Sequence, residues 1–137
     1  MSSLRKIYVD DKYKFTDGEI GKKLFIVIHV QQDFYLVLKT TSQSKRYSNV
    51  RQFCNPNKLV FYLPGHLKAG LDGDTYIQLH EIKKYTPQDL LQGNFNKTIR
   101  EVSELKDDIF NGLINCLKKC KDDIEEDIYN LLFSSGK

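Results

Sequence analysis

The sequence predicts a single α+β domain, a small barrel-like sheet of about five mostly antiparallel strands closed by a C-terminal helix. Two observations indicate this fold. Short runs of β-branched and aromatic residues, separated by turn signals, fill the first two thirds of the chain, and an apolar stripe at helical spacing fills the last third. The length of 137 residues suits one domain.

Composition excludes two classes of protein. Hydrophobic residues make up 40% of the chain and charged residues 28%, which excludes a disordered protein. The longest apolar runs, Leu24 to Ile28 and Leu59 to Leu63, are too short to cross a bilayer, and the N-terminus lacks the apolar core of a signal peptide. We therefore expect no membrane association and a cytoplasmic location.

The three cysteines are consistent with that compartment. Cys54 stands alone in the sequence, whereas Cys116 and Cys120 are four positions apart on a predicted helix, where they would share one face as small apolar packing residues. Because the chain has no C-x-x-C pair and no helical H-x-x-x-H pair, we expect no metal site and no cofactor.

The strands are predicted in chain order. The N-terminal segment 1–20 is expected to be loosely ordered apart from one short strand near Ile7 to Val9. Leu24 to Val30 is almost wholly apolar and rich in β-branched residues, as in a strand buried on both faces, and Phe34 to Lys39 returns beside it as a hairpin. After a loop over 42–57, the remaining strands are Lys58 to Leu63, Thr75 to Leu79 with Ile82 to Tyr85 after a bend, and Asn96 to Val102.

Two helices follow from capping and periodicity. Thr86 and Pro87 begin a short helix that Gly93 ends. The apolar stripe then predicts a long helix from Glu104 to Phe133, which would measure about 45 Å at 1.5 Å per residue and exceed the width of a small barrel. It must therefore break near 121–123, leaving an extra C-terminal helix over 122–133, or project and bury its end against another chain.

A polar run follows the second strand of the hairpin. Hydroxyls, an amide and two cations fill Thr40 to Tyr47, directly where the strand ends. Such donors match the oxygen acceptors of a phosphate, which favours a nucleic-acid backbone as ligand. The other interpretation is a polar loop that merely ends a strand, because Ser, Thr and Gln are ordinary loop residues.

Charge is unevenly distributed along the chain. Residues 1–70 contain twelve Lys and Arg against five Asp and Glu, while residues 71–137 contain nine against thirteen. A basic, strand-rich half of this kind attracts a polyanion, and the acidic helical half repels one. The alternative is a solvated surface whose asymmetry cancels in the folded state.

The order of these motifs resembles the MazF/PemK family of bacterial toxins. Gly21-Lys22-Lys23-Leu24, before the apolar run Phe25 to Ile28, is similar to the family's G-x-R-P motif, and Thr41 to Tyr47 is similar to its T-S or T-T-Q-S-K-x-Y segment. The likeness spans residues 20 to 121. Its later parts are Asp74 to Leu79, Ile82 to Lys84, Lys97 to Ile99, and Leu105 with Lys106.

The resemblance implies an SH3-like barrel and a metal-independent, sequence-specific endoribonuclease that cuts single-stranded RNA by attack of a 2′-hydroxyl. It also implies a cognate antitoxin and a homodimer as partners. Thr41 would orient the scissile phosphate, and Lys23 would stand where the family usually has its catalytic arginine. The RNA-binding residues implied are Lys22, Ser42, Gln43, Ser44, Lys45 and Arg46.

The lysine is a departure that leaves several alternatives open. A guanidinium grips two phosphate oxygens where an ammonium supplies one point charge. Lys23 could act as a base if buried, and Lys22 could equally be the aligned cation. We expect His29 to pack in the core, and His66 and His80, near predicted turns, are weak acid–base candidates.

Other functions and surfaces stay open as well. A barrel of this kind could be a gyrase-poisoning toxin of the related CcdB group, or a non-enzymatic module that binds RNA or protein. The C-terminal stripe of Ile124, Ile128, Leu131 and Leu132 is expected to form core or homodimer contacts, and otherwise a groove for the antitoxin.

Overall fold

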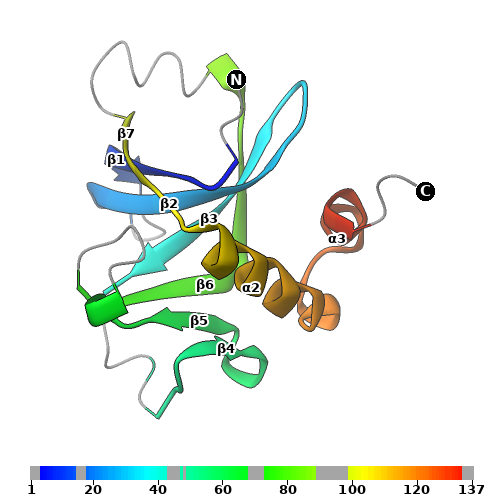
Figure 1. Cartoon of the computed structure of the whole chain (residues 1–137). Coiled ribbons are helices and arrows are strands. Elements are labelled where there is room, and N and C mark those ends of the chain that lie inside the picture. The colour runs from blue at the N-terminus through cyan, green and yellow to red at the C-terminus, as the bar shows by residue number, and fades with distance from the viewer. Residues whose placement is uncertain are drawn as a thin grey trace.

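The computed structural model describes residues 4–14, 18–42, 47, 49–67, 73–88 and 99–133 (Figure 1). These residues form an antiparallel sheet with helices on one side, so the predicted α+β class is confirmed. The strand order is β4-β5-β6-β3-β2-β1-β7. The strands are β1 Lys6–Lys14, β2 Ile20–Val30, β3 Tyr35–Thr41, β4 Phe53–Asn55, β5 Val60–Leu63, β6 Thr75–Tyr85 and β7 Ile99–Glu104.

The central hairpin of β2 and β3 agrees with the prediction. Ile26 pairs with Leu38, and the backbone N–H of Gln31 donates to the carbonyl of Phe34 at 2.9 Å to close the turn. β2 is apolar at successive positions because both of its faces are covered. The predicted strands over 58–63, 75–85 and 96–102 appear as β5, β6 and β7 within the described residues.

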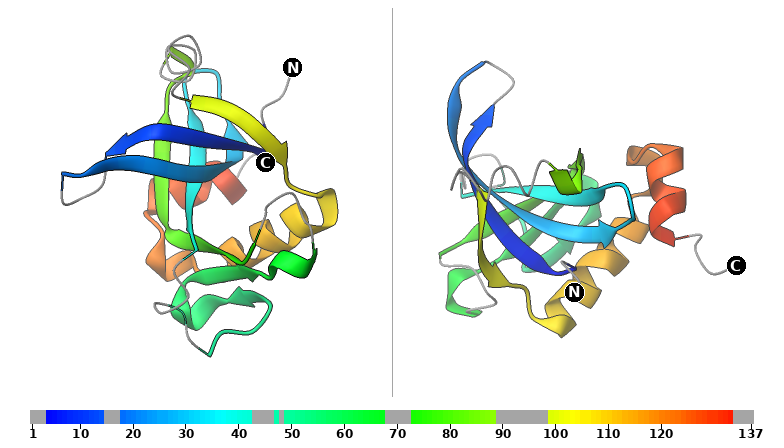
Figure 2. Two further views of the ribbon diagram at one scale, coloured as in Figure 1. Left: turned by 90° about the vertical axis from the view of Figure 1, so that its left-hand side faces the viewer. Right: turned by 90° about the horizontal axis from the view of Figure 1, so that it is seen from above.

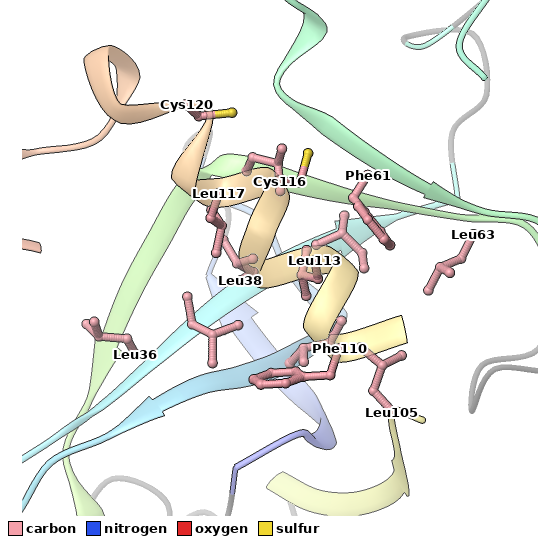
Figure 3. Packing of buried hydrophobic residues seen from close by; sticks show 14 of the residues in the cluster. Leu36, Leu38, Phe61, Leu63, Leu105, Phe110, Leu113, Cys116, Leu117 and Cys120 are labelled. Carbon is pink, nitrogen blue, oxygen red and sulfur yellow. The ribbon is translucent and has the colours of Figure 1, made fainter. Parts of the chain in front are cut away.

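One face of the sheet is covered by α2 (Asp107–Lys118). Its apolar side chains, Phe110, Leu113 and Leu117, pack on Leu36 and Leu38 of β3 within one buried cluster (Figure 3). The opposite face, which we call the outer face, carries separate clusters around Phe25 and around Tyr76. Figure 2 shows both C-terminal helices on the same side of the sheet, away from the outer face.

The long C-terminal helix breaks where the sequence predicts. α2 ends at Lys118, a 3-10 turn occupies Lys121–Asp123, and α3 runs over Glu126–Phe133. Ile128 is buried in the main core. Since Ile124 and Leu132 pack against the same core, the C-terminal stripe makes core contacts within its own chain.

Three features differ from the prediction. β1 is a nine-residue strand paired with both β2 and β7, longer than the short strand expected near Ile7 to Val9. The loop expected over 42–57 contains β4, which pairs with β5. The described sheet is open, with β4 and β7 as its edges, so it does not show the closure of a barrel. The helix expected from Thr86 to Gly93 lies largely outside the described residues.

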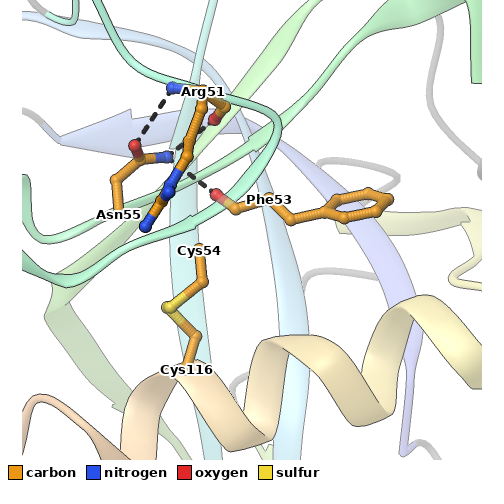
Figure 4. The surroundings of a disulfide bond; sticks show 5 residues. All are labelled: Arg51, Phe53, Cys54, Asn55 and Cys116. Atoms are coloured by element: carbon orange, nitrogen blue, oxygen red, sulfur yellow. Dashed lines mark hydrogen bonds between the residues drawn. A yellow bond between two sulfur atoms is a disulfide. The ribbon is translucent and has the colours of Figure 1, made fainter.

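Cys116 and Cys120 are both buried in the main core, as expected, but the disulfide was not expected. Cys54 of β4 forms a disulfide with Cys116 of α2, with a Cα–Cα distance of 5.5 Å (Figure 4). Sequence spacing could not reveal this pair, because its members are 62 positions apart and the fold alone brings them together. Cys120 is a buried free thiol, and burial raises its pKa above the usual value.

None of the described helices has the length and hydrophobicity needed to cross a membrane.

Replacing Cys54 by serine should lower the free energy of unfolding by about 2 to 4 kcal/mol, since the bond closes a loop of 62 residues in the unfolded chain. Urea titration measures the loss. Reductant should destabilise the parent protein to the level of the variant and leave the variant itself unchanged. A parent midpoint that does not respond to reductant would show that the bond contributes nothing.

Candidate nucleic-acid interface

Lys23 and Thr41 lie at the same end of the β2–β3 hairpin. Phe25 of β2 faces Lys39 of β3. Lys23 lies two positions before Phe25 and Thr41 two positions after Lys39, which is the same direction because the strands are antiparallel. The Thr40 hydroxyl donates to the Leu24 carbonyl at 3.1 Å, which ties the strands together beyond Phe25 and Lys39. Because side chains alternate along a strand, the register puts Lys23 and Thr41 on the outer face together. Both side chains are partly exposed.

A buried carboxylate lies beside this pair. Asp10 of β1 is the cross-strand partner of Lys23 and is only 8% exposed. It accepts hydrogen bonds from the Tyr85 hydroxyl at 3.2 Å and from the backbone N–H of Lys12 at 2.9 Å. A carboxylate removed from water in this way needs such partners and nearby positive charge.

Sequence reasoning missed Asp10, although a signal was present. Ile7 and Val9 alternate with Tyr8 and Asp10, so a regular strand puts Asp10 on the face away from the main core. Because the segment 1–20 was expected to be loosely ordered, this alternation was not interpreted as a strand that reaches Asp10.

Lysines and aromatic rings gather on the outer face next to the pair. Lys39 Nζ lies 5.4 Å and Lys83 Nζ 4.5 Å from the centre of the Tyr13 ring. Lys83 Nζ also lies 5.0 Å from the Tyr85 ring. Such cation–π contacts hold ammonium groups over rings without neutralising them. We call the set Asp10, Tyr13, Lys23, Lys39, Thr41, Lys83 and Tyr85 the outer-face patch.

A row of tyrosines leads from the patch toward β4. Tyr76 is the cross-strand partner of Thr41, and Tyr62 is the partner of Tyr76. Tyr76 stacks on Tyr62 at 4.8 Å and on Tyr47 at 5.5 Å between ring centres. Burial raises the pKa of the Tyr62 phenol, and the negative charge of Asp74 adds to the shift. The phenol therefore stays neutral around pH 7.

The other residues predicted to bind RNA fall into two groups. Lys22 is exposed and precedes Lys23 on β2, so alternation turns it to the opposite face from Thr41. This arrangement favours Lys23 over Lys22 as the cation beside Thr41. Ser42 follows β3 directly and is exposed. The remaining members, Gln43, Ser44, Lys45 and Arg46, lie outside the described residues.

The histidines lie away from the pair. His29 is partly exposed near the other end of β2, with Nε2 2.7 Å from Oε1 of Gln31, so the expectation of core packing was wrong. His66 is exposed in the 3-10 turn Gly65–Leu67. His80 lines a small pocket with residues of the C-terminal segment that include Ile124 and Ile128. No cluster of three or more His, Cys, Asp or Glu side chains suited to a metal ion occurs in the described part of the chain.

No protein-family model and no curated protein matches the chain. The likeness to MazF/PemK toxins therefore stays a hypothesis.

Replacing Tyr85 by phenylalanine should lower the free energy of unfolding by about 1 to 3 kcal/mol, because it takes a hydrogen-bond donor from the buried Asp10 carboxylate. Denaturant titration measures the change. Tyr129→Phe is the matched control, since that hydroxyl donates to the Lys118 carbonyl at 3.4 Å in an exposed position. Equal losses in the two variants would contradict the importance of the Asp10 contact.

Proposed function

We propose that this protein is an endoribonuclease of the toxin–antitoxin type, which cuts single-stranded RNA without a metal ion. The observation that carries the proposal is the register that puts Lys23 and Thr41 at one end of the outer face, beside buried Asp10. The resemblance to MazF/PemK toxins adds the SH3-like barrel as the proposed fold family.

The patch offers the charge-stabilising groups that cleavage by a 2′-hydroxyl needs, an ammonium and a hydroxyl for the phosphorane oxygens. In that reaction the 2′-oxygen bonds to phosphorus as the bond to the 5′-oxygen breaks, a base removes the 2′-hydroxyl proton, and the 5′-oxygen takes up a proton. Negative charge builds on the phosphorane oxygens, where fixed donors and cations stabilise it. We assign the ammonium of Lys23 and the hydroxyl of Thr41 to these oxygens.

Asp10 would act through Lys23 and not on the substrate. It faces Lys23 across two paired strands, and its oxygens already accept from Tyr85 and the Lys12 backbone. A carboxylate fixed in this way balances the charge of the ammonium and limits where Nζ can lie. Lys39 and Lys83 would supply further positive charge for the flanking phosphates.

The proposed partners follow from the same family resemblance. They are single-stranded RNA, a cognate antitoxin and a second copy of the chain in a homodimer. The proposed location is the cytoplasm, where messenger RNA is found. The Cys54–Cys116 disulfide counts against that location, because cytoplasmic thiols are normally kept reduced.

A non-enzymatic RNA-binding module is the second candidate. The stacked tyrosines and the lysines of the outer face suit binding of bases and phosphates equally well. The described histidines lie away from the Lys23–Thr41 pair, which leaves the proton transfers without a typical acid–base group. RNA that is bound by the purified protein and stays intact would favour this candidate.

Thr41→Ala and Lys23→Ala should each reduce the rate of RNA cleavage in EDTA by about a hundredfold or more, as expected when one stabilising donor is removed. Gel analysis of a labelled RNA measures the rate. Lys84→Ala is the matched control, because Lys84 is an exposed lysine of β6 whose neighbour Lys83 belongs to the patch. Lys22→Ala should reduce the rate of RNA cleavage much less than Lys23→Ala does.

Two outcomes would contradict the proposal. Intact RNA at high concentrations of the parent protein would remove the enzymatic activity altogether. Cleavage that survives both Thr41→Ala and Lys23→Ala would leave the activity elsewhere on the molecule.

A further inference from the structure

A polar pocket beside the edge strand β4 has no role in the chemistry proposed above. It has a volume of about 240 Å³ and is lined by Asn49, Arg51, Asn55, Pro56, Asn57 and Lys58. We call it the Asn55 pocket. It is formed by the segment that precedes β4 and by the 3-10 turn Pro56–Lys58 that follows it.

The pocket is held in shape by one amide side chain. Asn55 Oδ1 accepts from the Arg51 backbone N–H at 3.1 Å, and Nδ2 donates to the carbonyls of Arg51 at 2.8 Å and Phe53 at 2.9 Å (Figure 4). The disulfide at the neighbouring Cys54 fixes the same strand to α2. The hydrogen bonds of Asn55 and the disulfide of Cys54 thus both restrain the loop. A restrained loop loses less conformational entropy when a ligand binds.

The lining has the chemistry of a nucleotide site. Arg51 and Lys58 are exposed cations, and no carboxylate is among the six lining residues. Cations of this kind contact phosphate oxygens, and a guanidinium does so with two parallel hydrogen bonds. Asparagine amides both donate and accept, as the edges of unpaired bases require.

The position of the pocket connects it to the outer-face patch. The cross-strand row from Thr41 passes through Tyr76 and Tyr62 to Phe53 of β4, two residues before Asn55. Three strand spacings of about 4.8 Å separate the ends of this row by about 14 Å. A single strand with a rise of about 3.4 Å per stacked nucleotide covers that distance in about four nucleotides. The partly exposed Tyr62 lies between, where it offers a ring to stack on.

We propose that the Asn55 pocket is a second RNA subsite, which binds a phosphate and its adjacent base a few nucleotides from the phosphate held by Lys23 and Thr41. Arg51 and Lys58 contact the phosphate, and the amides of Asn49 and Asn57 contact the base edge. The inference rests on the proposed function for the location of the other phosphate. A second subsite makes efficient cleavage depend on the length of the RNA and gives the enzyme a second position at which it can recognise a base.

The test compares two substrates that differ only in length. A dinucleotide occupies the outer-face patch and cannot reach the pocket, whereas a ten-nucleotide RNA of mixed sequence can occupy both. The double variant Arg51→Gln/Lys58→Gln should reduce kcat/KM for the ten-nucleotide RNA about tenfold or more and leave that for the dinucleotide unchanged. It keeps the Asn55 contacts, because these involve only the backbone of Arg51.

Binding gives a second readout that does not need cleavage. In fluorescence anisotropy with Thr41→Ala protein and the ten-nucleotide RNA, the double variant should weaken binding and reduce the slope of log K against log salt by about 1 to 2. Lys106→Gln/Lys119→Gln is the matched control, since both lysines are exposed at the ends of α2. This control removes two positive charges, as the double variant does. Urea midpoints confirm that all variants fold.

The outcomes separate this inference from the proposed function. Cleavage of the long RNA that falls equally in the double variant and in the control would overturn the subsite and leave the nuclease standing. RNA binding that depends on Arg51 and Lys58 without any cleavage would keep the subsite and overturn the nuclease. A protein that neither binds nor cuts the RNA would contradict both.

Discussion

The register of the β2–β3 hairpin is the constraint on which the candidate site depends. Phe25 lies opposite Lys39, and the Thr40 hydroxyl bonds to the carbonyl of Leu24. A slip of one residue would turn Thr41 to the helix side of the sheet and leave Lys23 where it is. The apolar side chains that β3 directs at α2, Leu36 and Leu38, oppose that slip because it would turn them away from the main core.

The two faces of the sheet differ in the charged residues that they carry. The helix side carries seven of the thirteen acidic residues of the segment 71–137, which lie on α2, α3 and the segment between them: Asp107, Asp108, Asp122, Asp123, Glu125, Glu126 and Asp127. The outer face carries Lys23, Lys39 and Lys83 around stacked aromatic rings. The asymmetry along the sequence thus becomes an asymmetry in space, which favours approach of a polyanion from the outer face.

Local sequence signals predicted the elements whose pairing is local. The β2–β3 hairpin was predictable because Leu24 to Val30 and Phe34 to Lys39 are apolar runs separated by a short turn. The break after α2 was predictable because one straight helix would be longer than the sheet is wide. The length of β1 was not predictable, since Asp10, Asp11 and Lys12 interrupt its apolar pattern at a register shift. β4 is only three residues long and is stabilised by β5 and by the disulfide to α2, contacts that no local pattern encodes.

The candidate site shows the same limit. Thr41 and Lys23 could be selected from the polar run and the basic strand entrance, but their common face follows from register and not from composition. Asp10 depends on a partner far away in the chain, the Tyr85 hydroxyl. The Asn55 pocket is local, but its shape comes from side-chain contacts of Asn55 that composition does not reveal. We propose that one end of the outer face stabilises a pentacoordinate phosphorus formed by attack of a 2′-hydroxyl.

Mass spectrometry of the ends of RNA cut by the purified protein in EDTA tests that claim most directly. The account predicts a 2′,3′-cyclic phosphate upstream of the cut and a 5′-hydroxyl downstream, and no cleavage where the nucleotide before the cut lacks its 2′-hydroxyl. Fragments with a 3′-hydroxyl and a 5′-phosphate, or cleavage of the 2′-deoxy substrate, would contradict it.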